Sequence, residues 1–136
     1  MRRFLTFLLF FLIQQSISAQ DCTELKNDPE MRQELQDIAN SAANRLMRCC
    51  SSYGGNNIKA DIVWDKDESG VCQTRISKLS NRITITMKVS WNGSMSGAQY
   101  WILGRLIVEG NSGSKSWEKI QDSGGFKSGC SQNCIN

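Results

Sequence analysis

The stretch Arg82–Trp91, RITITMKVSW, decides the fold, because apolar and polar residues alternate along its whole length. The apolar side holds Ile83, Ile85, Met87, Val89 and Trp91, and the polar side holds Thr84, Thr86, Lys88 and Ser90. Successive side chains of a β-strand point to opposite faces of the sheet. The pattern therefore predicts a strand with one covered face.

The flanking segments predict further strands of the same sheet. On the N-terminal side, Ile58–Trp64 alternates clearly, and Val71–Leu79 alternates more weakly, with Cys72 and Ile76 as its inward positions. Ser80 and Asn81 then turn the chain. On the C-terminal side we expect a fourth strand at Gln99–Glu109 and a fifth at Lys115–Gln121.

A different period precedes the strands. From Pro29 to about Cys50, apolar residues recur at intervals of three and four, which indicates an amphipathic helix. They are Met31, Leu35, Ile38, Ala42, Leu46 and Cys49. Asp28 can cap this helix, and Pro29 suits its first position.

The order of elements predicts an α+β fold. An N-terminal amphipathic helix would pack on one face of a four- to five-stranded antiparallel meander. This helix-then-sheet layout is similar to that of cystatins and NTF2-like proteins. The Gln-x-Val-x-Gly inhibitory pattern of cystatins is absent, since the nearest segment, VSWNG at Val89–Gly93, lacks the glutamine.

Residues 1–19 have the layout of a secretory signal peptide. Arg2 and Arg3 precede an apolar run, Phe4–Ile13, and small and polar residues follow it up to Ala19. The run is shorter than the roughly 20 residues that a membrane span needs. We expect cleavage after Ala19 or Ser18 and a single secreted, disulfide-rich domain at 20–136, extracellular, or periplasmic in a Gram-negative bacterium.

All six cysteines follow the leader: Cys22, Cys49, Cys50, Cys72, Cys130 and Cys134. An even number in an exported chain favours three disulfides, among 15 possible pairings. Cys49 and Cys50 are adjacent, so we expect them to bond to different partners. A zinc site at CSQNC is disfavoured, because oxidation competes for the thiols and the chain has no histidine. We expect no cofactor.

Composition excludes several functions. Without Arg2 and Arg3, the chain has 14 basic and 13 acidic residues. This nearly neutral net charge is not that of a nucleic-acid-binding protein. The absence of histidine rules out a Ser-His-Asp triad. Asp61, Asp65, Asp67 and Glu68 could supply the carboxylate pair of a hydrolase, with Asp61 or Asp65 first, but a solvated acidic edge explains them better.

The segment Trp64–Cys72, WDKDESGVC, resembles the first half of a calcium loop. Asp65, Asp67 and Ser69 occupy alternate positions before Gly70. The second half fails, because the glutamate expected at position twelve is Ile76. We expect no bound metal and interpret the segment as the polar tip of a hairpin.

Asn92, Gly93 and Ser94 form a glycosylation sequon. If the source is a eukaryote, Asn92 is the expected acceptor, on an exposed loop. The Asn-Gly pair is also typical of a hairpin turn, and both interpretations can hold together.

The predicted strand YWILGRLIV, Tyr100–Val108, is apolar on both faces. One face must meet the helix. The other carries Trp101, Leu103, Arg105 and Ile107, and either the tail covers it, or it lines a pocket, or it binds a partner. Tryptophan and arginine together are enriched where proteins bind.

These patterns predict a secreted protein-binding module, such as an inhibitor, effector or host-interaction factor, without catalytic activity and without a membrane span. Trp101, Leu103, Arg105 and Ile107 would contact an extracellular protein partner. The alternative is a carrier of a small hydrophobic ligand, with Trp64, Trp91 and Trp101 lining its cavity. A carboxylate-based hydrolase is the remote alternative.

Overall fold

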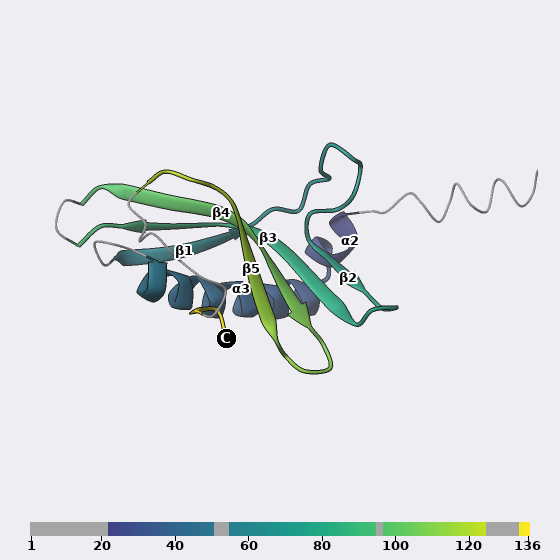
Figure 1. Cartoon of the computed structure of the whole chain (residues 1–136). Helices are drawn as coiled ribbons and strands as arrows, with labels where there is room; N and C mark the ends of the chain where they lie inside the picture. Colours follow the sequence, from purple (N-terminus) through teal and green to yellow (C-terminus); the bar gives the residue numbers. More distant parts are fainter. Residues whose placement is uncertain (1–21, 51–54, 95–96, 125–133) are drawn as a thin grey trace, which may run out of the picture.

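The computed structural model describes residues 22–50, 55–94, 97–124 and 134–136. They form two helices and an antiparallel sheet (Figure 1). The elements are α2 (Thr23–Asn27), α3 (Pro29–Cys50), β1 (Asn56–Ile62), β2 (Arg75–Ser77), β3 (Arg82–Asn92), β4 (Gln99–Glu109) and β5 (Lys115–Asp122). The predicted signal peptide lies outside the described residues.

The long helix predicted from the sequence is confirmed as α3. Asp28 caps it as expected, since its Oδ1 accepts hydrogen bonds from the backbone N–H groups of Glu30 (3.1 Å) and Met31 (3.3 Å). The same residue ends α2, a short helix that the sequence pattern did not predict. The buried stripe of the helix is shifted from the predicted one, because Met31, Ile38 and Cys49 are only half-buried, whereas Ala39 and Ala43 are fully buried.

The sheet is antiparallel with strand order β1-β3-β4-β5, but it is not the predicted meander. Both β1 and β2 pair with β3, and neither pairs with the other: Ala60 lies opposite Val89, and Ile76 lies opposite Ile83. The physical reason is length. The 11-residue β3 is long enough to pair with two short strands, one after the other along the same side.

Helix and sheet contribute to one hydrophobic core. Its buried members from α3 are Leu35, Ala39, Ala42, Ala43 and Leu46, and those from the sheet are Ala60, Ile85, Met87, Val89, Trp91, Ile102, Leu106, Val108 and Trp117. Gln36 of α3 also donates a hydrogen bond to the carbonyl oxygen of Ala60 in β1 (2.9 Å). Figure 1 shows α3 running along one side of the sheet.

The polar side of β3 is only partly solvent-exposed. Thr84 and Thr86 are buried, although their positions in the alternation place them opposite the core. The Thr86 hydroxyl donates to the carbonyl of Gln73 (2.8 Å), and the Thr74 hydroxyl donates to that of Val63 (2.8 Å). The segment between β1 and β2 therefore covers this end of the face, and the Cys22–Cys72 disulfide joins it to the start of α2.

Candidate binding surface

The four residues predicted to contact a partner lie in one row on β4. Trp101, Leu103, Arg105 and Ile107 alternate with buried positions along the strand, and each of the four is half-buried. Their neighbours Ile102, Leu106 and Val108 belong to the core. Because strand residues alternate between faces, the row lies on the face opposite the core. We call this row, with Lys88 of β3 and Glu118 of β5, the open face.

Lys88 is the partner of Trp101 on the open face. Its Nζ lies 5.0 Å from the centroid of the indole ring, within the range of a cation–π interaction. The two residues are diagonal neighbours, because Trp101 is paired with Ser90 and Leu103 with Lys88. The ammonium group therefore lies over the indole at one end of the open face.

An ion pair occupies the middle of the open face. Arg105 Nη1 donates to Glu118 Oε2 at 3.3 Å, and the two residues are cross-strand partners in β4 and β5. The Arg105 side chain is 34% exposed and that of Glu118 is 66% exposed, so solvent screens the pair. Breaking this ion pair would cost little free energy. The Arg105 guanidinium is therefore available to a carboxylate of a binding partner.

The described end of the tail does not cover the open face. Ile135 is fully buried in the core, on the other side of the sheet. The Asn136 side chain bonds to both the N–H and the carbonyl of Lys115 at 2.7 Å, which fastens the chain end to the edge of β5. Residues 125–133 of the predicted covering tail lie outside the described residues.

The segment 64–72 forms a compact hairpin tip. Asp67 Oδ1 accepts hydrogen bonds from the backbone N–H groups of Ser69 (2.9 Å) and Val71 (3.0 Å). Gly70 has a φ of 79°, a left-handed conformation that suits glycine. The Asp67 carboxylate thus stabilises the turn of its own loop.

The carboxylates considered for catalysis or metal binding lie on β1 and on the hairpin tip that follows it. Asp61 and Asp65 are both exposed, and Asp61 lies 3.7 Å from the ammonium of Lys59. Within the described ranges, no group of three or more histidine, cysteine, aspartate or glutamate side chains could hold a metal ion. Asp65, Asp67 and Glu68 are therefore not brought together as ligands.

One of the predicted disulfides is present. Cys22 and Cys72 are joined across 50 positions of sequence. Cys49 is half-buried beside the core, and Cys134 is half-buried next to Ile135. The side chains of Cys50 and Cys130 lie outside the described residues, so the other two disulfides stay predictions.

The tryptophans assigned to a carrier cavity do not share one side of the sheet. Trp91 is buried in the core and Trp64 packs against that core, whereas Trp101 lies on the open face. A cavity lined by all three is therefore wrong for this fold.

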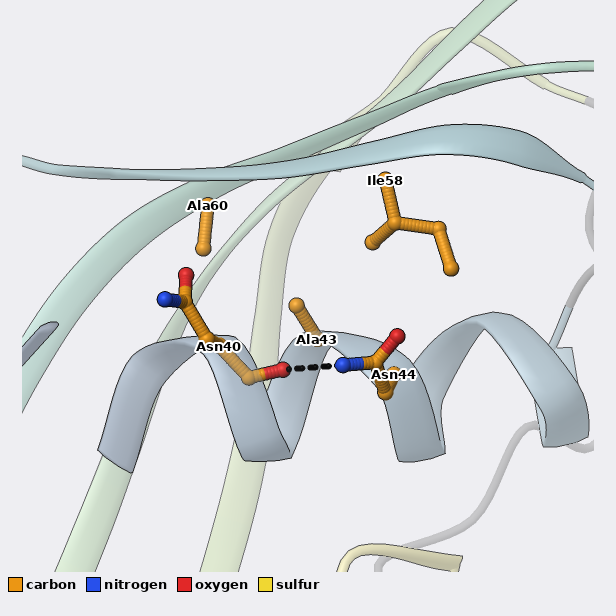
Figure 2. Close-up of a pocket in the computed structure, with 5 residues that line it drawn as sticks. All are labelled: Asn40, Ala43, Asn44, Ile58 and Ala60. Atoms are coloured by element: carbon orange, nitrogen blue, oxygen red, sulfur yellow. Dashed lines mark hydrogen bonds between the residues drawn. The ribbon is translucent and has the colours of Figure 1, made fainter. Parts of the chain in front are cut away.

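A small groove lies between α3 and β1, lined by Asn40, Ala43, Asn44, Ile58 and Ala60 (Figure 2). Its volume of about 250 Å³ is below the roughly 300–1,000 Å³ of typical small-molecule sites. Its polar groups bond to the helix itself, because Asn44 Nδ2 donates to the Asn40 carbonyl and Asn40 Oδ1 accepts from Gln36. The groove therefore offers few groups for recognising a ligand.

At the end of β5, the pKa of Asp122 is held below its ordinary value of 3.8. The main cause is a hydrogen bond from Lys119, whose Nζ lies 2.6 Å from Asp122 Oδ2, and the backbone N–H of Gly124 adds a second bond at 2.8 Å. Both bonds favour the ionised carboxylate. Asp122 thus fastens the turn that follows β5.

Sequence reasoning did not identify Lys88 and Glu118 as members of this surface. Lys88 stood on the polar side of its predicted strand, but its contact with Trp101 and the ion pair of Glu118 with Arg105 depend on cross-strand register. Register is set by the fold and cannot be read from one strand.

Compared with known protein families, curated proteins and solved structures, the chain matches none of them. Neither described helix is long and apolar enough to cross a membrane.

Proposed function

We propose that the chain is a secreted, disulfide-stabilised module that binds an extracellular protein through its open face and has no catalytic activity of its own. In this proposal α3 packs on the opposite face of the sheet, as the shared core residues suggest. The observation that carries the proposal is the row of Trp101, Leu103, Arg105 and Ile107, half-buried on the face opposite the core.

The chemistry of the row suits a protein partner. Trp101, Leu103 and Ile107 offer apolar area, and Arg105 offers bidentate hydrogen-bond donors beside Glu118. Aromatic residues and arginine dominate the energetic centres of protein interfaces. The backbone of a hydrogen-bonded strand is already ordered, so partner binding costs little backbone conformational freedom.

The test compares capture of one extracellular protein by matched variants. A photoreactive amino acid replaces Ile107 in one variant and Leu79 in the other, because Leu79 is a fully exposed apolar residue in the turn between β2 and β3. We expect a discrete crosslinked protein from extracellular fluid only with the group at position 107.

The captured protein is then titrated against the wild type, the Trp101→Ala/Arg105→Ala double variant and Leu79→Ala. We expect the double variant to bind at least about 10-fold more weakly and Leu79→Ala to bind normally. Both should keep a melting temperature close to that of the wild type. Equal affinity for all three chains, or a collapse of stability in the double variant, would show that the row serves the fold instead.

A further inference from the structure

The sequon of this chain lies at the end of β3. Asn92 is the last residue of the strand, and its backbone is paired with Asn56 of β1 and Gln99 of β4. The next two residues leave the sheet: the Gly93 N–H donates to the carbonyl of Ala98 (2.8 Å), and Ser94 is exposed. The hairpin connection therefore spans residues 93–98, longer than the two-residue Asn-Gly turn considered from the sequence.

The surroundings of Asn92 leave room for a large substituent. By alternation along β3, its side chain lies on the same face as Ser90 and Lys88. Its two lateral neighbours, Asn56 and Gln99, are both exposed. No hydrogen bond joins the Asn92 amide to other residues in the part of the chain that the structure describes. Asn92 itself is half-buried at the end of β3, not on the expected exposed loop, but it lies on the face opposite the core, so a group attached to Nδ2 would extend away from the core.

Trp101 is the one aromatic residue of the open face, and it lies diagonal to Asn92. Trp101 is paired with Ser90, so Lys88 occupies one diagonal position on β3 and Asn92 the other. Diagonal cross-strand neighbours lie about 7–8 Å apart, within reach of aromatic and long side chains. Lys88 already reaches the indole from its side. A sugar on Asn92 would reach it from the opposite side.

We propose that Asn92 carries an N-linked glycan whose first sugar packs against the indole of Trp101. In the reaction, Asn92 Nδ2 forms a bond to C1 of a sugar donated by a lipid diphosphate-linked oligosaccharide. The bond from C1 to the diphosphate oxygen breaks, the lipid diphosphate leaves, and the amide loses one proton. Ser94 provides the hydroxyl that the sequon requires. The oligosaccharide is transferred while the chain enters the secretory compartment, before β3 and β4 pair with each other.

The contact has a chemical basis. The faces of sugar rings carry C–H bonds, and a tryptophan face is apolar with a negative quadrupole. Trp101 is half-buried and its open-face neighbours are mostly polar, so the ring retains apolar area that water solvates poorly. The glycan would cover only part of the Trp101 indole, so that a protein partner could still contact the ring together with the rest of the row.

The first experiment measures attachment without any binding partner. The full chain with its own leader is secreted from cultured animal cells, and its intact mass is recorded before and after treatment with an amidase that removes N-linked glycans. We expect the wild type and Ser94→Thr to lose the mass of one glycan, with an aspartate left in place of Asn92. Asn92→Gln and Ser94→Ala should show the bare polypeptide throughout. A bare wild type, secreted beside a glycosylated control protein, would overturn the proposal.

The second experiment tests the packing on Trp101. Melting temperatures are compared for glycosylated and enzymatically deglycosylated protein in the wild type, Trp101→Ala and Leu103→Ala. Loss of the glycan should lower the melting temperature of the wild type and of Leu103→Ala by on the order of 2 °C. The shift should vanish in Trp101→Ala. Equal shifts in all three proteins would show that the sugar does not contact Trp101.

Discussion

The indole of Trp117 lies directly against Gly104. The nearest atoms to a Cβ built on Gly104 are Cζ2 and Cη2 of that ring and the backbone oxygen of Glu118, and all are closer than real Cβ atoms approach. Gly104 belongs to β4 and Trp117 to β5, on the core face of the sheet. A side chain is thus excluded at position 104, which explains a glycine in the middle of a strand, where it otherwise weakens structure.

Gly104→Ala should therefore destabilise the fold. The added methyl must displace the large ring or the backbone of Glu118, so we expect a loss of about 1–3 kcal/mol in the free energy of unfolding. Urea denaturation followed by far-UV circular dichroism measures it. In a Trp117→Leu background, which removes the ring, the same substitution should cost less, because only the backbone oxygen of Glu118 still crowds the added methyl. An equal cost in both backgrounds would contradict this explanation.

Removing the Cys22–Cys72 disulfide should also destabilise the chain. The bond joins residues 50 positions apart, and its loss frees a long loop in the unfolded chain. We expect Cys22→Ala/Cys72→Ala to lose about 2–4 kcal/mol. Thermal unfolding of the oxidised proteins measures the loss, and retention of the wild-type stability would contradict it.

The cap at Asp28 should contribute to the stability of α3. Its Oδ1 accepts from two backbone N–H groups of the first turn, which otherwise have no helical partner. Asp28→Ala should cost about 1 kcal/mol in the free energy of unfolding, whereas Asp28→Asn, which preserves an acceptor oxygen, should cost much less. Denaturant titration distinguishes the two variants, and equal losses would show that the cap does not act through these bonds.

Asp122 should make a small contribution that depends on pH. Its pKa is lowered in the folded state, so the ionised form stabilises the fold above the unfolded pKa, and this stabilisation is lost as the pH falls through the folded pKa. At pH 7 we expect Asp122→Asn to cost on the order of 0.5 kcal/mol, a modest value because Lys119 is largely exposed. The difference from the wild type should shrink as the pH falls below about 3.8 and disappear once the pH is below the lowered pKa of the folded state.

The control for Asp122 is Lys119→Ala, which removes the main cause of the shift. An NMR titration of the Asp122 carboxyl should then give a pKa closer to the ordinary value. An unchanged pKa in this variant would show that Lys119 is not the cause.

The local elements could be predicted because their signals are local. The alternation in Arg82–Trp91 and Gln99–Glu109 and the three-to-four spacing in Pro29–Cys50 reflect the geometry of a single strand or helix. The candidate surface was found in the same way, since Trp101 and Arg105 fall on the second face of an apolar strand. Residue types alone also predict export and disulfide crosslinking. Export stays a prediction, and of the predicted crosslinks the Cys22–Cys72 disulfide is observed.

The pairing between segments was not predictable from those signals. Local alternation does not say which strands become neighbours, so β1 and β2 were expected to pair with each other and instead both pair with β3. The burial of Thr86 likewise depends on Gln73, which is distant in sequence. Short-range periodicity carries no information about such contacts.

By itself, then, the sequence determined the helix, the main strands and the two apolar faces of β4, because side-chain direction follows from backbone geometry. The tertiary structure alone decided that Cys22 meets Cys72, that Trp117 excludes a side chain at Gly104, and that Lys88 reaches Trp101. Each of these contacts joins residues from different segments, and only the three-dimensional register of the packed chain brings them together.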